Sequence, residues 1–109
     1  MEQISPAQLT DWAQAQAQRP VLLDVREGWE VQTASAQNEA MDKLHMPMQT
    51  IPARLNELDK SRPIACLCHH GSRSMQVATF LQQHGFQVAN VSGGIHAWSV
   101  QVDPTIPVY

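Results

Sequence analysis

The sequence PIACLCHHGSRS at residues 63–74 decides the fold, because it joins a strand pattern directly to a helical pattern. The apolar run at residues 63–67 is typical of a strand that is buried inside a sheet. A helical pattern begins at Ser74, so Cys68 lies where a strand meets the N-terminus of a helix. Ligands of open α/β sheets bind at the carboxyl ends of the strands. The sequence therefore predicts a binding site at Cys68.

The surroundings of Cys68 favour a reactive thiol. Backbone N–H groups in such a turn point into its hollow, and the helix dipole adds partial positive charge there, which stabilises a thiolate or a bound oxyanion. Arg73 adds a full positive charge, and Gly71 suits a tight loop that needs a positive φ. We expect Cys68 to be an exposed catalytic nucleophile. The expected substrate- and anion-binding loop consists of His69, His70, Gly71, Ser72, Arg73 and Ser74.

Strand and helix patterns alternate along the rest of the chain. Strands are predicted at residues 21–25, 44–46, 63–67 and 87–91, and helices at residues 6–19, 51–58, 74–84 and 95–99. Ser5 is expected to cap the first helix, and Trp98 is expected to anchor the last one in the core. Residues 27–43 have a weak pattern that indicates a short helix followed by irregular chain. This alternation predicts an α/β layer with a mainly parallel sheet.

Length and composition exclude several classes of function. The 109 residues have the size of a single domain, which we place at residues 1–109. The formal net charge of -3 and the 7 basic residues argue against a nucleic-acid partner. No apolar stretch is long enough to span a bilayer, and the first residues lack the basic and apolar regions of a signal peptide. We therefore expect a cytoplasmic protein without a membrane partner.

The two cysteines, Cys66 and Cys68, are separated by one residue. We expect their side chains to lie on opposite faces of the strand, with Cys66 buried as a small apolar residue and no disulfide between them. His69 and His70 follow Cys68 directly, but three adjacent residues rarely converge on one ion, and no other Cys or His has zinc spacing. We therefore expect neither a metal site nor a cofactor.

Three separated motifs resemble the rhodanese family of sulfurtransferases. They are LLDVRE at residues 22–27 followed by Glu30, CHHGSRS at residues 68–74 and VSGGIHAW at residues 91–98. The resemblance covers nearly the whole chain and implies a three-layer α/β/α domain around a five-stranded, mainly parallel sheet. One departure concerns residues 36–43, where the family commonly has a glycine-containing turn before the second core strand.

The resemblance also implies a reaction in two steps. The Cys68 thiolate takes the outer sulfur of an anionic donor, such as thiosulfate or a persulfide, and becomes a persulfide itself. A thiol, cyanide or the cysteine of another protein then accepts that sulfur, which is covalent catalysis of the ping-pong type. Asp24 and Arg26, from the first motif, are expected to support the site from behind as an ion pair or through loop hydrogen bonds.

Two other functions fit the same residues. Phosphatases and arsenate reductases of this fold also combine a cysteine with an arginine, but their loops place five residues between the two, whereas four separate Cys68 from Arg73. The shorter loop favours sulfur over a tetrahedral phosphoryl group. The second alternative is a module without catalytic activity that carries sulfur or regulates a partner. The presence of Cys68, Gly71 and Arg73 favours an enzyme.

Overall fold

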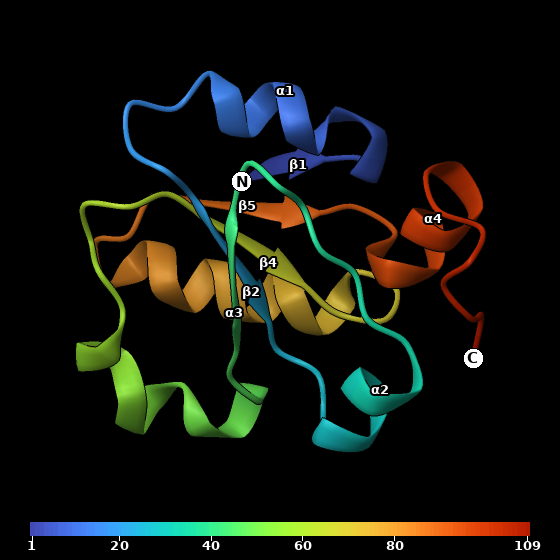
Figure 1. Ribbon diagram of the computed structural model, residues 1–109. Coiled ribbons are helices and arrows are strands. Elements are labelled where there is room, and N and C mark those ends of the chain that lie inside the picture. Colours follow the sequence, from blue (N-terminus) through green and yellow to red (C-terminus); the bar gives the residue numbers. More distant parts are fainter.

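The computed structural model describes residues 1–109 and contains one sheet of five parallel strands (Figure 1). The order across the sheet is β1-β5-β4-β2-β3. The strands are β1 (Glu2–Ile4), β2 (Val21–Asp24), β3 (Asp42–His45), β4 (Ile64–Leu67) and β5 (Val88–Val91). All four pairs of neighbouring strands run parallel, so their carboxyl ends meet at one edge. Cys68 follows β4 at that edge, as the sequence predicts.

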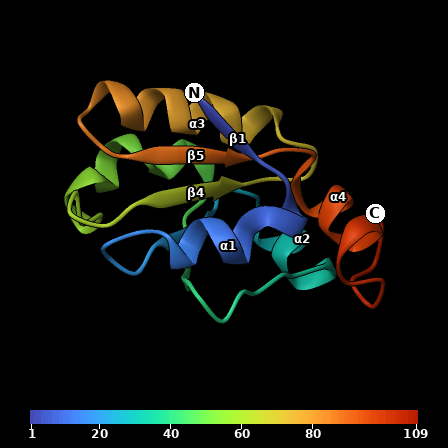
Figure 2. The same ribbon diagram turned by 90° about the horizontal axis from the view of Figure 1, so that it is seen from above.

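Helices cover both faces of the sheet, which confirms the expected three-layer α/β/α fold (Figure 2). One face is covered by α1 (Leu9–Gln14) and α4 (Gly94–Gln101), and the other by α3 (Ser72–Gln83) with the 3-10 segments η2 (Met48–Thr50) and η3 (Pro52–Glu57). The short helix α2 (Gly28–Thr33) follows β2, and the 3-10 turn η1 (Pro6–Gln8) precedes α1. Trp98 is 3% exposed and belongs to the core beneath α4, as expected.

The central strands are apolar on both sides because both sides are covered. On the α3 side Cys66 belongs to one core cluster with Val77 and Leu81, and on the α1 side Ala65 belongs to another with Leu9. Each core cluster contains 14 buried residues, so the two layers are about equally developed. This rigid base fixes the position at which the chain leaves β4 and enters the loop at Cys68.

The structure differs from the sequence expectation in three local features. The edge strand β1 was not predicted, because it has only three residues and two of them are exposed. Ser5 occupies the N-cap position with Pro6 directly after it, as expected, but its side chain makes no capping hydrogen bond, and the first helix begins with a 3-10 turn before α1. The segment predicted as a helix at residues 51–58 is 3-10 in form, with a non-helical backbone at Arg54.

The two cysteines lie on the same face of the sheet and not on opposite faces. Both belong to the core cluster on the α3 side, because residues two apart along an extended chain point the same way. Both are free thiols. Cys66 is fully buried, and this burial raises the pKa of its thiol well above the ordinary value. Cys66 is therefore a packing residue, as the sequence suggests.

Candidate active site

The loop after β4 closes around the sulfur of Cys68. Cys68 Sγ accepts a hydrogen bond from the Gly71 N–H at 3.1 Å and lies 3.2 Å from Ser74 Oγ. Gly71 has φ 106, a left-handed conformation that glycine adopts without strain. Cys68 is only 1% exposed, so the expectation of an exposed thiol is wrong. The loop backbone and the first turn of α3 cover the sulfur.

Helix α4 holds the outer side of this loop. The Ile95 N–H donates to the Cys68 carbonyl at 2.9 Å, and the His96 N–H donates to the His69 carbonyl at 3.1 Å. A Cβ atom on Gly94 would lie 2.5 Å and 2.4 Å from these two carbonyl oxygens, so only glycine allows the contact. The N–H of a trans peptide points away from its C=O. The amides of His69 and His70 are therefore turned away from α4.

Asn90 on β5 orders the inner side of the loop. Its Nδ2 donates to the Gly71 carbonyl at 3.1 Å, and its Oδ1 accepts from Ser74 Oγ at 2.5 Å. The Ser74 hydroxyl has one proton, so Asn90 Oδ1 and Cys68 Sγ compete for it. Sequence analysis missed Asn90, because its role depends on the register that places β5 beside β4.

Arg73 is paired with Glu30 of α2. Two parallel hydrogen bonds of 2.7 Å and 2.8 Å join its guanidinium to the carboxylate, whose side chain is 4% exposed. These bonds lower the pKa of Glu30 to about 2 and raise the pKa of Arg73 above its ordinary value. Glu30 also closes a capping box at the start of α2 with Glu27. The positive charge expected beside Cys68 is therefore balanced by a carboxylate.

Asp24 and Arg26 form a fully buried ion pair at the end of β2. Arg26 Nη2 donates to Asp24 Oδ2 at 2.7 Å, and Nε donates to Oδ1 at 2.9 Å. The other three N–H groups of Arg26 donate to the carbonyls of Glu30 and Ala34 and to the Tyr109 hydroxyl. All five donors of the guanidinium are thus satisfied. The pair anchors α2, and with it the carboxylate that holds Arg73.

The C-terminal residue Tyr109 completes the site and was not predicted to do so. Its hydroxyl donates to Glu30 at 3.0 Å, and its ring stacks on His69 with centroids 3.9 Å apart and planes 4° apart. Trp29, 63% exposed, meets the same ring edge-on.

The histidines of the loop lie beside this ring. Burial, together with His70, lowers the pKa of His69, whose Nε2 is buried without a hydrogen-bond partner. The His70 and His96 rings lie 5.2 Å apart beside it.

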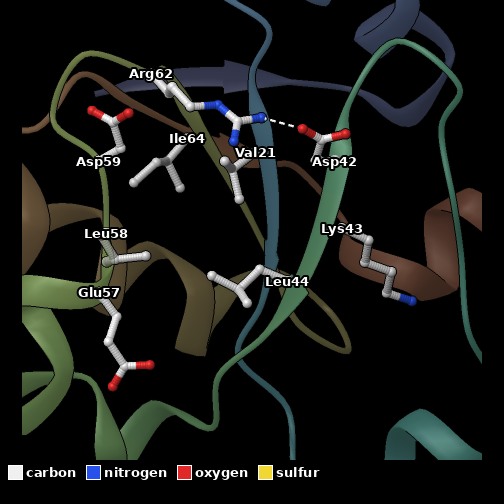
Figure 3. A pocket seen from close by; sticks show the side chains of 9 residues that line it. All are labelled: Val21, Asp42, Lys43, Leu44, Glu57, Leu58, Asp59, Arg62 and Ile64. Atoms are coloured by element: carbon white, nitrogen blue, oxygen red, sulfur yellow. Dashed lines mark hydrogen bonds and ion pairs between the residues drawn. The ribbon is translucent and has the colours of Figure 1, made fainter.

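A separate hollow lies at the opposite edge of the sheet, near the amino ends of β2, β3 and β4 (Figure 3). Its lining mixes acidic, basic and aliphatic side chains, and Figure 3 shows the ion pair between Arg62 and Asp42 at its margin. No three His, Cys, Asp or Glu side chains are grouped so as to hold a metal ion. The helices are all too short or too polar to span a bilayer.

The sequence matches a known protein family. The family model of the rhodanese-like domain matches residues 5–101. The chain belongs to the rhodanese-like domain family. The first and last motifs of the sequence and the loop at residues 68–74 all lie within the matched part.

The relatives include enzymes and parts of longer proteins. The chain is 31% identical to the thiosulfate sulfurtransferase GlpE of Actinobacillus pleuropneumoniae, covering 88% of this chain and 84% of GlpE. It is 42% identical to the rhodanese-like/PpiC domain-containing protein 12 of Arabidopsis thaliana over 81% of this chain, but spans only 30% of that protein. A rhodanese-like domain protein from Staphylococcus aureus superposes with a TM-score of 0.78 at 28% identity, covering 100% of this chain and 99% of that one.

Proposed function

We propose that this rhodanese-like domain is a sulfurtransferase that carries sulfur as a persulfide on Cys68. The observation that carries the proposal is the set of donors around the sulfur of Cys68. The Gly71 N–H donates a hydrogen bond to Sγ, and the Ser74 hydroxyl lies beside it. Such donors stabilise negative charge on sulfur both in the thiolate and in the persulfide. The sulfurtransferase relatives add independent support.

The first half-reaction loads the enzyme. The Cys68 thiolate attacks the outer sulfur of the donor, the S–S bond of the donor breaks, and the remainder leaves with the bonding electrons. The Gly71 N–H faces the charge that develops on sulfur, and the amides of His69 and His70 are turned away from α4, which occupies the carbonyls of Cys68 and His69. Asn90 holds Ser74 and Gly71 in place, so the cradle needs little rearrangement before the reaction.

The second half-reaction releases the sulfur. A nucleophile such as cyanide, a thiol or the cysteine of another protein attacks the outer sulfur of the persulfide and restores the thiolate. In this scheme the residues of the loop, His69 to Ser74, bind anionic groups, while Asp24 and Arg26 support the loop through α2. No metal or cofactor takes part in either step.

The paired state of Arg73 also bears on the phosphatase alternative. A phosphoryl group carries two negative charges and is bound well by the two parallel N–H groups of an arginine fork. Here the arginine of the loop already binds Glu30 through two hydrogen bonds. The site therefore fits sulfur transfer better than phosphoryl transfer.

Thiocyanate formation tests the proposal. The protein is incubated with a sulfane-sulfur donor and cyanide, and Cys68→Ala is compared with Cys66→Ala. We expect Cys68→Ala to lose all activity while its circular dichroism stays unchanged, and Cys66→Ala to keep most of its activity. Equal activity in Cys68→Ala and the unmodified protein would overturn the proposed nucleophile.

A further inference from the structure

Asn90 of β5 lies between the edge strand β1 and the loop at Cys68. The parallel pairing of β1 with β5 places Gln3 directly beside Asn90 (Figure 2). Asn90 is 3% exposed, and both hydrogens of its Nδ2 are used. One is donated to Gln3 Oε1 at 3.0 Å and the other to the Gly71 carbonyl at 3.1 Å. This buried amide thus joins two parts of the chain that meet only in the folded sheet.

The Gly71 carbonyl fixes which way the Asn90 amide points. A carbonyl oxygen only accepts hydrogen bonds, so the atom of Asn90 that faces it has to be the nitrogen. Oδ1 therefore faces Ser74, whose Oγ lies 2.5 Å away. Because Oδ1 carries no hydrogen, this contact needs the single proton of the Ser74 hydroxyl. Without that proton, the lone pairs of two oxygens would repel each other at this distance.

The Ser74 hydroxyl therefore donates to Asn90 while Cys68 is a thiol. Ser74 Oγ lies 3.2 Å from Cys68 Sγ and can accept a hydrogen bond from the thiol S–H. A thiolate needs donors instead, and it receives one from the Gly71 N–H. It gains the Ser74 proton only if Asn90 Oδ1 loses it. A buried acceptor without a donor is costly, so this arrangement disfavours the bare thiolate.

A persulfide on Cys68 does not incur this cost. Loading turns Cys68 Sγ into a bridging sulfur without charge, and the negative charge moves to the outer sulfur. The Ser74 proton then stays with Asn90 Oδ1. The contacts from Asn90 through Ser74 to Cys68 therefore distinguish the loaded sulfur from the unloaded one.

Resting on the proposed sulfur transfer, we propose that Asn90 is a positioning residue that holds the Ser74 proton away from Cys68 and so favours the persulfide over the bare thiolate. On release, an acceptor thiolate forms a bond to the outer sulfur. The S–S bond to Cys68 breaks, and its electron pair stays on Sγ as the Cys68 thiolate. Because Asn90 disfavours this thiolate, it slows unloading, and the domain holds its sulfur until a strong nucleophile attacks it.

The first measurement is the thiolate content of the unloaded protein, which does not depend on sulfur transfer. The ultraviolet absorbance of the thiolate is followed during a pH titration. The same titration of each variant with Cys68→Ala is subtracted, which removes the signals of Cys66 and Tyr109. Asn90→Leu keeps the approximate size of the side chain but offers Ser74 no acceptor. We expect the ratio of thiolate to thiol, at a pH where the thiol predominates, to rise about 10-fold in Asn90→Leu.

Ser74→Ala supplies the matched background for this measurement. If Asn90 acts through Ser74, Asn90→Leu changes the ratio when Ser74 is present and leaves it unchanged in Ser74→Ala. A substitution that merely loosened the loop would act in both backgrounds. The other titratable and charged groups around the sulfur are the same in all these variants, so their contribution cancels. They are Cys66, His69, His70 and Arg73, with Glu30 of α2 and His96 of α4 behind them.

The second measurement follows the loaded protein. Cys68 is loaded with inorganic polysulfide, the donor is removed, and sulfur release to a fixed concentration of a thiol is followed by intact mass. A thiolate that is better stabilised leaves faster, so Asn90→Leu should release its sulfur about 3-fold faster than the unmodified protein. In the Ser74→Ala background, Asn90→Leu should not change the rate of release.

Two results would overturn the proposal in different ways. If Asn90→Leu leaves the thiolate ratio unchanged or lowers it, or raises it equally in Ser74→Ala, the role given to Asn90 is wrong while sulfur transfer stands. If no donor adds sulfur to Cys68, the proposed sulfur transfer is wrong, and the preference for the persulfide falls with it.

Should Asn90→Leu fail to fold, Ser74→Ala decides alone. A hydroxyl that donates to Asn90 gives the thiolate little net help, so the thiolate ratio should fall by less than about 3-fold in Ser74→Ala. A fall of about 10-fold would show that the hydroxyl donates to the thiolate without hindrance, and would contradict the role of Asn90.

Discussion

The two edges of the sheet use the same kinds of charged residue in different surroundings. At the amino edge, Asp42 binds Arg19 at 2.9 Å and Arg62 at 2.5 Å, with the Asp42 side chain 56% exposed. At the carboxyl edge, Asp24 binds Arg26 with both side chains fully buried. Water screens the charges of the exposed Asp42 pairs, whereas Asp24 and Arg26 have exchanged their contacts with water for contacts within the protein. The comparison teaches that burial, and not the residue types, decides what an ion pair does.

The carboxyl edge adds a second difference, because its pairs are linked. Arg26 donates to Tyr109, Tyr109 donates to Glu30, and Glu30 holds Arg73 of the loop that follows Cys68. The charged residues of the amino edge line the hollow of Figure 3, and no comparable chain of contacts joins them to Cys68. Changes at the carboxyl edge should therefore affect both stability and the site, and changes at the amino edge should affect neither strongly.

The largest expected effect comes from removing a buried carboxylate. Asp24→Ala leaves Arg26 as an uncompensated buried charge and should lower the free energy of unfolding by about 3–5 kcal/mol. Asp42→Ala should have a much smaller effect, because water replaces its contacts. Urea unfolding of both variants at pH 7 measures the difference. Equal losses at the two edges would contradict the role given to burial.

A glycine substitution sharpens the comparison further. Gly94→Ala forces a Cβ to within 2.5 Å of the Cys68 carbonyl in a left-handed conformation, which should cost about 2–4 kcal/mol and slow sulfur loading. Gly85, near the amino edge, also has a positive φ, but only the flexible end of Lys60 is close to it. Gly85→Ala should cost about 1–2 kcal/mol and leave loading unchanged. Thermal unfolding and the rate of loading report the two effects separately.

Much of the edge that carries Cys68 could be predicted from the sequence. The strand, loop and helix around residues 63–74 follow from local patterns and from Gly71, whose φ is indeed positive. The pairing of Arg73 with Glu30 spans 43 positions, and the contact of Tyr109 with Glu30 spans 79. Such contacts arise only when the folded layers meet, so no local pattern reveals them. The burial of Cys68 was missed because the loop backbone and the first turn of α3 close over its sulfur, which the residue pattern alone does not show.

Acid should weaken the carboxyl edge in a defined range. Folding lowers the pKa of Glu30 from 4.5 to about 2, through its bonds to Arg73. The lowered value means that this contribution to stability is complete above about pH 4.5 and is lost as the pH falls toward about 2. It amounts to about 3 kcal/mol at neutral pH. Urea unfolding between pH 6 and pH 2 should show this loss in the unmodified protein and a flatter profile in Glu30→Gln; parallel profiles would contradict the assignment.

The smallest effect expected at the carboxyl edge concerns the hydroxyl of Tyr109. Tyr109→Phe keeps the ring on His69 but removes one acceptor from Arg26 and one donor from Glu30, which should cost about 1–2 kcal/mol. Ser61→Ala removes an exposed hydroxyl near the amino edge and should change stability by less than about 0.5 kcal/mol. Differential scanning calorimetry can resolve the two. If Tyr109→Phe left the stability of the protein unchanged, the Tyr109 hydroxyl would not contribute to this network.

The central claim is that sulfur is carried on Cys68 and not on its neighbour Cys66. The most direct measurement is to load the protein with an organic persulfide, trap it with iodoacetamide and map the modified peptides by mass spectrometry, beside Cys66→Ala and Cys68→Ala. The account predicts one additional sulfur at Cys68 in the unmodified protein and in Cys66→Ala, and none in Cys68→Ala. Additional sulfur on Cys66, or loading that persists in Cys68→Ala, would contradict it.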